Sequence, residues 1–556
     1  MRRCLVTAVF AFVIFAMLAP PVFAQAPAAP PAPKVTITGL FDQMTTAGRN
    51  FYDGNYSRDN DREWYARTRF RPDFEFAVGR TKAVLGLEID LMYGQGGSND
   101  GGFPGNTSGF AGGFSGGSKS GTNGALDTNT DVGGMIEIKW IYTEFDLTGK
   151  DSVLPFIPFL TVARAGGQPF GTIANYKVYY ANGDFAGLDL YSTFTPDIKN
   201  HFAFVIVEDQ LAGGNRAAAT ARTSRGEDYA FIISPEITPF KGLDLKPMFS
   251  WFHADGATAG AARRSATNVR SIGGNIAGAT AVGGGAPAGD SANTEDRYTV
   301  GLDARLRIGP FGLDPTISYQ TGRYDSQAVR TNGAVGKVSG DTAAWLFDVI
   351  ASYQLGPLLL EARGMYSTGN KARDNLALSK RYYEPLNLDT GYFSGGWLGI
   401  LGLGVDYFNG GGGANQQMDT NIGYDRYGRA QFAIRATYSI TPALSVYGVV
   451  APTWAAEKVD TDTGCPALTV ATSNTGCVTR TAVNSNSFAE GDSRYIGTEV
   501  NGGFTWRFAP NTAFDLAAYY LAAGSALKMT EQLNGVAVKR DQNDAYYASA
   551  RVRLSF

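Results

Sequence analysis

The last eleven residues, 546–556, limit the possible fold more than any other stretch, because two kinds of side chain alternate along them. The apolar set is Tyr546, Ala548, Ala550, Val552, Leu554 and Phe556. The polar set is Tyr547, Ser549, Arg551, Arg553 and Ser555. A period of two places these sets on opposite faces of a β-strand. About 10 residues is also the length of a tilted strand that crosses a bilayer. The stretch therefore predicts a membrane-crossing strand with Phe556 at its end.

The same alternation recurs along the chain and predicts eighteen strands. Each pair of strands is joined by a short turn, and a longer polar stretch follows it. The predicted strands are 35–45, 63–78, 83–93, 134–146, 156–165, 186–194, 201–209, 228–238, 243–253, 297–308, 313–323, 343–354, 358–367, 427–439, 444–455, 493–508, 513–523 and 546–556. Sixteen strands are the alternative. The apolar run 397–408 would make nineteen, and we place it instead in a long loop, 368–426, that folds over or into the barrel.

This arrangement resembles the Gram-negative outer-membrane β-barrel porins over residues 35–556. Such barrels have an even number of strands, short periplasmic turns and long extracellular loops. The resemblance implies a closed antiparallel transmembrane β-barrel, all-β, in the outer membrane with both termini in the periplasm. It further implies that the terminal Phe556 is an assembly signal for the barrel-assembly machinery. The expected surroundings are outer-membrane lipid and lipopolysaccharide, and a homo-oligomer is possible.

The first residues have the features of a targeting segment rather than of the fold. Arg2 and Arg3 precede an apolar run, 5–18, and Val22-Phe23-Ala24 provides a small-residue cleavage site. These features predict a secretory signal peptide at 1–24. A Pro/Ala linker follows at 25–34. The remaining residues, 35–556, form the predicted barrel.

The composition supports a barrel and argues against a nucleic-acid-binding protein. The chain contains 70 glycines, 28 tyrosines and 34 phenylalanines, and only 18% of its residues are charged. Amphipathic strands, glycine-rich loops and aromatic belts give such a mixture. Tyrosines and tryptophans near strand ends suit those belts: Trp64, Tyr93, Trp140, Tyr142, Trp251, Trp345, Tyr438 and Trp506. The net charge of −3 argues against a nucleic-acid partner.

In a barrel the polar face of each strand lines the lumen. The pore-lining residues predicted in this way are Arg67, Arg69, Arg71, Glu88, Asp90, Arg305, Arg307, Arg429, Arg435, Arg507, Arg551 and Arg553. Closure places the last strand beside the first, so Arg551 and Arg553 share a wall with the arginines of 67–71. This basic wall near acidic side chains either creates a field across a water-filled pore or braces the barrel with ion pairs.

The chain offers little material for catalysis or metal binding. His201 and His253 are the only histidines and lie far apart. The loop 53–61 spaces oxygens as calcium loops do, but Arg58 occupies the place of the turn glycine. We therefore expect no catalytic residues, no metal, no cofactor and no enzyme activity. Cys465 and Cys477 are expected to form a disulfide, the default for such a pair outside the cytoplasm.

These patterns predict a porin that lets small hydrophilic solutes diffuse through a charged lumen, with a slight anion preference. A second interpretation is an exporter of an acidic polysaccharide, since the arginine-lined wall and the strand number resemble the alginate-export family of barrels. A third is a barrel plugged by loop 368–426 that serves as adhesin, receptor or envelope scaffold. The sequence leaves the solute and the oligomeric state open.

Overall fold

The computed structural model describes residues 32–50, 62–93, 136–181, 183–212, 224–255, 280–281, 294–329, 335–371, 374, 378–386, 397–401, 427–459, 461, 491–533 and 536–556. Eighteen long strands form one ring. They are β1 (Lys34–Arg49), β2 (Arg62–Val78), β3 (Thr81–Tyr93), β4 (Ile136–Thr148), β5 (Leu160–Pro169), β6 (Asp184–Thr195), β7 (Ile198–Ala212), β8 (Ser224–Phe240), β9 (Leu243–Asp255), β11 (Thr294–Ile308), β12 (Phe311–Val329), β13 (Val335–Leu355), β14 (Leu358–Ser367), β16 (Arg429–Thr441), β17 (Leu444–Val459), β18 (Ser493–Ala509), β19 (Thr512–Ala523) and β22 (Ala545–Ser555).

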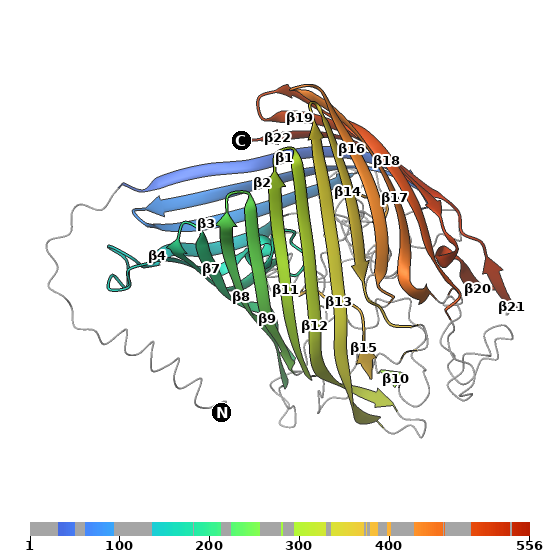
Figure 1. Ribbon diagram of the computed structural model, residues 1–556, viewed down its shortest axis with the longest axis horizontal. Helices are drawn as coiled ribbons and strands as arrows, with labels where there is room; N and C mark the ends of the chain where they lie inside the picture. The colour runs from blue at the N-terminus through green and yellow to red at the C-terminus, as the bar shows by residue number, and fades with distance from the viewer. Residues whose placement is uncertain are drawn as a thin grey trace.

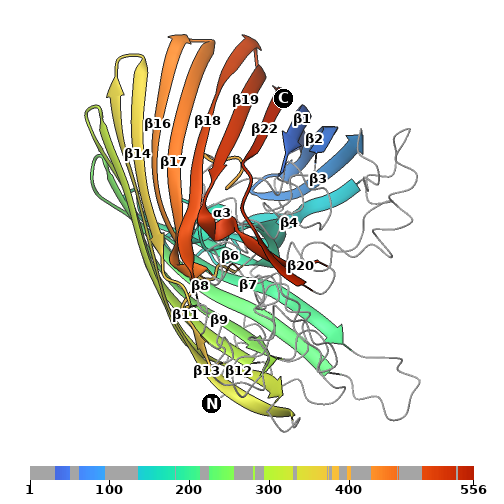
Figure 2. The ribbon, with the colours of Figure 1, turned by 90° about the vertical axis from the view of Figure 1, so that its right-hand side faces the viewer.

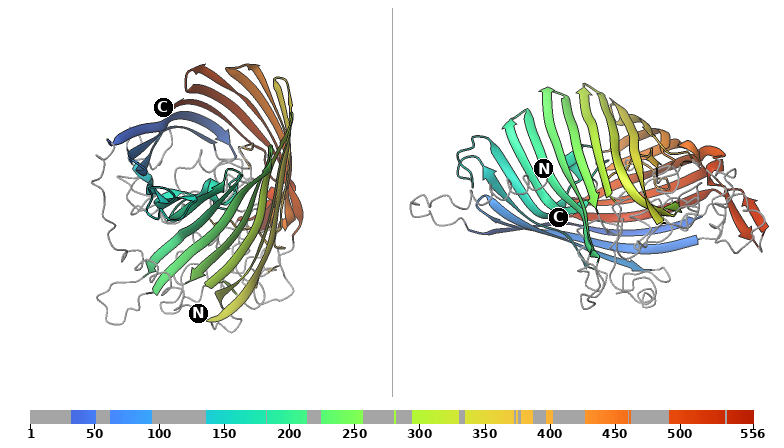
Figure 3. Two further views of the ribbon diagram at one scale, coloured as in Figure 1. Left: turned by 60° about the vertical axis from the view of Figure 1, so that its left-hand side comes forward. Right: turned by 90° about the horizontal axis from the view of Figure 1, so that it is seen from below.

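Every strand of the ring pairs antiparallel with two others, and the ring closes where β1 meets β22. In Figure 2, β22 lies between β19 and β1, as the pairing requires. Figure 1 shows consecutive strands side by side, and Figure 3 shows the sheet curving round from two further directions. A closed ring satisfies the backbone hydrogen bonds without an exposed edge, which is what a strand structure in hydrocarbon requires. The eighteen-strand prediction is confirmed.

The remaining elements are short, and in the sequence they fall in the connections between strands of the ring. Helix α3 (Gly171–Ala174) follows β5, and a 3-10 helix, η3 (Ser525–Leu527), follows β19. β10 (Thr280–Ala281) pairs with β12, and β15 (Ser379–Lys380) pairs with β13. β20 (Met529–Leu533) and β21 (Val536–Arg540) form a separate hairpin. No helix among the described residues is long and apolar enough to cross a membrane.

Large apolar side chains cover the outer face of the ring, whereas the inner face carries its charged side chains together with buried apolar ones such as Val205 and Leu346. On β3, Val84, Gly86 and Glu88 are buried on the inner face, whereas Leu85 and Ile89 pair with Phe74 and Phe70 on the outer face. Large apolar side chains are exposed on the outside of most strands, including Val35, Trp64, Ile141, Val300 and Ile434. An outer face of this kind needs hydrocarbon around it. The predicted outward apolar face is therefore confirmed on β3, and β4 departs from the prediction at a bulge.

Short turns join the strands at one end, where the termini of the ring also lie. Seven of these turns have two residues, among them Gly309-Pro310, between β11 and β12, and Gly356-Pro357, between β13 and β14. Gly309 has φ +57° and Gly356 has φ +56°, a left-handed conformation that glycine adopts without steric cost. Proline fits there because no ladder hydrogen bond is lost. The sequence predicted both turns.

Three expectations need correction. Trp140 and Tyr142 are not on the outer face, because the register slips between Gly86 and Leu87 and Lys139 is the extra residue of a bulge. Trp140 instead covers Gly86 inside the barrel. β5 begins at Leu160 rather than at 156, because the connection from β4 forms an extra bridge between Thr148 and Leu154. The hairpin of β20 and β21 was missed, although Asn534-Gly535 is a hairpin sequence.

The closing seam supplies a test of the fold. Gly39 and Phe556 exchange two backbone hydrogen bonds of 2.9 and 3.0 Å. A Cβ added to Gly39 would lie 2.6 Å from the Arg71 carbonyl oxygen and 2.7 Å from the Phe556 ring. We expect Gly39→Ala to destabilise the barrel by about 1–3 kcal/mol, measured as a lower temperature of heat-induced unfolding on gels. Gly448→Ala is the matched control, since its nearest contact would be 3.9 Å away. Equal unfolding temperatures would contradict the seam geometry.

Candidate functional site: the charged interior of the barrel

The seam carries the first group of interior charges. Asp42 on β1 accepts hydrogen bonds from the guanidinium of Arg551 on β22, with Nε to Oδ1 at 2.7 Å. Arg67 on β2 lies 3.6 Å from the same carboxylate. Asp42 and Arg67 are buried, with side-chain exposures of 1% and 3%. Closure therefore brings three strands from the two ends of the chain onto one carboxylate, and the basic wall predicted from the sequence is braced by Asp42.

A second cluster is centred on Glu88 of β3. Its carboxylate lies 2.9 Å from Arg69, 3.0 Å from Arg71 and 3.3 Å from Lys139. Lys139 also reaches Asp184 at 3.4 Å. Glu88 is buried, while the side chain of Arg71 retains 29% of its exposure and packs over the Trp140 ring. Arg71 is thus both a partner of Glu88 and a positive charge facing the interior.

The segment 170–181, which contains α3, runs inside the barrel. At one wall, Lys246 donates to the Thr172 carbonyl at 2.7 Å and Ser234 donates to the Ala174 carbonyl at 2.9 Å. Further along, the Lys177 ammonium lies 3.1 Å from Asp348 and its backbone N–H donates to Asp303 at 2.9 Å. These contacts hold the segment from β8 and β9 across to β13. It narrows the space inside the barrel.

The segment 378–386 packs against the same region through a buried charge cluster. Arg297 on β11 donates to Glu295 at 2.9 Å and to Glu384 at 2.7 Å. Lys380 lies 3.3 Å from Glu295 and 3.5 Å from Glu384. Burial lowers the pKa of the Lys380 ammonium, but Glu295 and Glu384 outweigh burial and hold this pKa above its ordinary value. Leu386 donates to the Tyr180 carbonyl at 2.8 Å, so the two inner segments touch.

A third inner segment, 397–401, is anchored by Glu499 of β18. The carboxylate accepts hydrogen bonds from the backbone N–H groups of Gly399, Ile400 and Leu401 at 2.7, 3.1 and 2.9 Å. Arg429 donates to the Leu401 carbonyl at 3.0 Å. Trp397, Leu398, Ile400 and Leu401 belong to a buried apolar cluster inside the barrel. The described part of the run 397–408 therefore lies in a loop that enters the barrel, and is not a strand.

The other predicted pore-lining arginines are on the inner face but in different surroundings. Arg305 stacks over the Tyr176 ring at 4.2 Å, and Arg307 pairs with Asp314. Arg435 lies 3.8 Å from Glu361 and packs over Trp397 and Tyr447. Arg507 is exposed near the short turns. Asp90 is opposite Arg69 in the register, and its side chain is outside the described residues.

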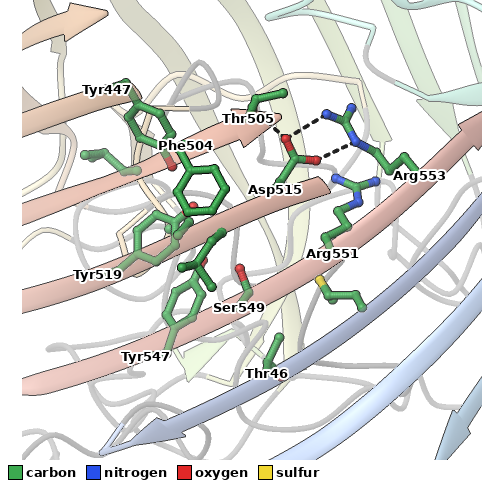
Figure 4. A pocket seen from close by; sticks show the side chains of 15 residues that line it. Thr46, Tyr447, Phe504, Thr505, Asp515, Tyr519, Tyr547, Ser549, Arg551 and Arg553 are labelled. Carbon is green, nitrogen blue, oxygen red and sulfur yellow. Dashed lines mark hydrogen bonds and ion pairs between the residues drawn. The ribbon is translucent and has the colours of Figure 1, made fainter. Parts of the chain in front are cut away.

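A pocket of about 200 Å³ opens between β1, β17, β18, β19, β22 and the segment 397–401 (Figure 4). Arg553 forms two hydrogen bonds with Asp515, at 2.7 and 3.0 Å, and Thr505 donates to Asp515 at 2.6 Å. The rings of Tyr519 and Tyr547 stack with centroids 4.2 Å apart. The pocket combines aromatic rings, hydroxyl groups and paired charges.

Several residues of the interior were missed by the sequence analysis. Asp42 was not singled out, although it alternates with the outward Phe41 in β1. Lys177 and Glu384 fall in connections, where period-two patterns do not apply. The run Tyr176-Lys177-Val178-Tyr179-Tyr180 was the available indication, because such aromatic density does not suit a solvated loop.

Other predictions concern residues outside those described. The signal peptide at 1–24, the disulfide of Cys465 and Cys477 and the loop 53–61 all lie there, and they remain predictions. Within the described residues no group of three or more His, Cys, Asp or Glu side chains is arranged to hold a metal ion. His201 contacts Asp189 at 3.0 Å, and His253 contacts Asp296 at 2.7 Å.

Comparisons with known proteins find solved structures similar to this chain, but no relatives by sequence. No family model and no curated protein matches the chain. OccK8 (OprE) of Pseudomonas aeruginosa is similar over 94% of this chain and 98% of its own, with 11% identity and a TM-score of 0.42. A BenF-like porin from Pseudomonas fluorescens Pf-5 is similar over 94% of this chain and 98% of its own, with 10% identity and a TM-score of 0.44. OccAB1 of Acinetobacter baumannii is similar over 94% of this chain and 97% of its own, with 11% identity and a TM-score of 0.44. The barrel assignment stands on the strand pairing described above.

Asp42 and Asp515 both pair with arginines of β22 but differ in burial, with side-chain exposures of 1% and 21%. Mutation can test whether this difference in burial sets their contributions to stability. Asp42→Ala leaves Arg67 and Arg551 without their shared buried carboxylate, and we expect a loss of about 3–5 kcal/mol. Asp515→Ala removes the partner of the more exposed Arg553 and should cost at most about 1 kcal/mol. Urea unfolding in lipid vesicles measures both. Equal losses would show that burial of the Asp42 cluster does not govern its contribution.

Proposed function

We propose that this protein is a porin of the Gram-negative outer membrane, through which small hydrophilic solutes diffuse. The observation that carries the proposal is a closed ring of eighteen strands with exposed apolar side chains outside and charged side chains inside. Hydrocarbon suits the first face, and water suits the second. A water-soluble barrel has no reason to expose Trp64, Val35 and Ile434 together.

The orientation follows from the lengths of the connections. Seven strand pairs are joined by turns of two residues, and both ends of the ring lie at that side. Short turns face the periplasm in bacterial barrels, so both termini are periplasmic. The outer side then carries the long connections, which meet lipopolysaccharide. Phe556, stacked on Phe70 at the seam, is the proposed assembly signal for the barrel-assembly machinery.

The inner segments favour a narrow channel for small solutes. Segments 170–181, 378–386 and 397–401 occupy part of the interior and are fixed to the wall by buried ion pairs and hydrogen bonds. Positive groups remain accessible from the interior: Arg305 and Arg507 are exposed, and Arg71 is half-buried. Permeation through such a path depends on its radius and on the charges that line it. We therefore propose a slight preference for anions.

The plugged barrel is the second candidate, and the same three segments favour it. If they fill the interior completely, the protein serves as adhesin, receptor or envelope scaffold. The polysaccharide exporter receives less support, because Arg67, Arg69, Arg551 and Arg553 each have a carboxylate partner within the wall. A polyanion would have to compete with those carboxylates.

Conductance of the purified protein in planar bilayers tests the proposal. We expect ohmic steps with a slight anion preference. Replacing Arg67, Arg69 and Arg71 together with Ala removes positive charge from one wall and should shift the reversal potential towards cations. Glu88→Gln, which removes one negative charge from the same cluster, is the matched control and should shift the potential towards anions. Absence of steps would support the plugged barrel, and block by a polyuronate would support the exporter.

The anchor of segment 397–401 distinguishes a narrowed channel from a sealed one. Glu499→Ala removes the acceptor of three backbone N–H groups, so the segment should leave the wall. We expect a larger single-channel conductance in this variant than in the wild type. Glu361→Ala is the control, since Glu361 is half-buried on the inner wall and its nearest charged partner, Arg435, lies 3.8 Å away. If Glu499→Ala leaves the conductance unchanged, segment 397–401 does not restrict the path.

A further inference from the structure

The pocket beside the seam has charged groups that are already paired. Arg551 holds Asp42 in two hydrogen bonds, and Arg553 holds Asp515 in two more. An anionic solute would have to displace one of these carboxylates. A neutral solute can hydrogen-bond to the paired groups without separating them, and bonds to charged groups are the stronger ones.

Hydroxyl groups line the floor of the same pocket. Thr46 of β1 and Ser549 of β22 are direct partners in the register and both line it. Thr46 is buried, with 2% exposure, and its hydroxyl has no hydrogen-bond partner among the residues that the structure describes. A buried hydroxyl without a partner is costly, so a ligand that supplies one gains affinity. Figure 4 places Thr46 and Ser549 beside Tyr547.

The aromatic side of the pocket consists of stacked tyrosines. Tyr519 and Tyr547 are register partners on β19 and β22, with rings inclined by 18°. Gly399 of the inner segment rests against them, because a Cβ there would lie 2.3 Å from the Tyr547 hydroxyl. Tyrosine offers an apolar ring and a polar tip, which suits a solute with both C–H and O–H groups.

From these features we propose that the pocket binds a small uncharged polyhydroxylated solute, of the size of a monosaccharide or a sugar alcohol. Its volume of about 200 Å³ lies below the ~300 Å³ at which drug-sized sites begin, so a single small unit fits. The Thr46 and Ser549 hydroxyls bind hydroxyl groups of the solute, and the tyrosine rings contact its C–H groups. The inference rests on the proposed function, because it names a solute class for that path.

Calorimetry on the detergent-solubilised full chain tests the proposal without requiring an open channel. D-glucose and sorbitol are the neutral probes, and acetate is the anionic probe. We expect saturable binding of a neutral probe, weakened about 3- to 10-fold by Thr46→Val, which removes one hydroxyl from a side chain of the same shape. Ser549→Ala should weaken binding similarly.

Thr342→Val is the matched control. Thr342 on β13 is also buried, and its hydroxyl also lacks a hydrogen-bond partner within the described part of the chain, but it does not line the pocket. Binding of neither neutral probe, binding of acetate alone, or equal weakening by Thr46→Val and Thr342→Val would overturn the proposal. Bilayer conductance without saccharide binding would support the porin function and overturn the proposed binding pocket. Saccharide binding without conductance would support the binding pocket and overturn the porin function.

Discussion

The structure depends on the hydrogen-bonded contact between β1 and β22, two strands from opposite ends of the chain. In hydrocarbon no water can satisfy an open strand edge, so a sheet of this kind must close. Closure fixes which strands are neighbours and therefore which inward side chains can meet. The cluster of Asp42, Arg67 and Arg551 exists only because the ring is closed.

The interior follows a second constraint, which is that buried charges need partners. Glu88, Arg297 and Glu499 meet this need in three different ways: with cations of neighbouring strands, with acids of an inner segment, and with backbone N–H groups. In the last two cases the charged wall residue also holds a connection inside the barrel. The interactions that pair these charged wall residues therefore also reduce the free space inside the barrel.

Much of the fold was predictable because strand patterns are local. The alternation in 83–93 and 546–556 and the Gly-Pro turns after β11 and β13 are visible without knowing any partner. Trp140 and Tyr142 were assigned to the wrong face because a bulge at Lys139 reverses the alternation, and no single strand reveals where its neighbour slips. Lys177 and Glu384 were missed because connections carry no period.

The sequence by itself favoured eighteen strands over sixteen and, away from the bulge at Lys139, predicted which face turns outward and which arginines point inward, since these depend on spacing along one strand. Only the tertiary structure decided which carboxylate each arginine meets and which connections enter the barrel. The reason is that ion pairs such as Arg551 with Asp42, and anchors such as Glu499 with Gly399, join residues far apart in the chain. Their geometry arises from register and closure, which no local pattern contains.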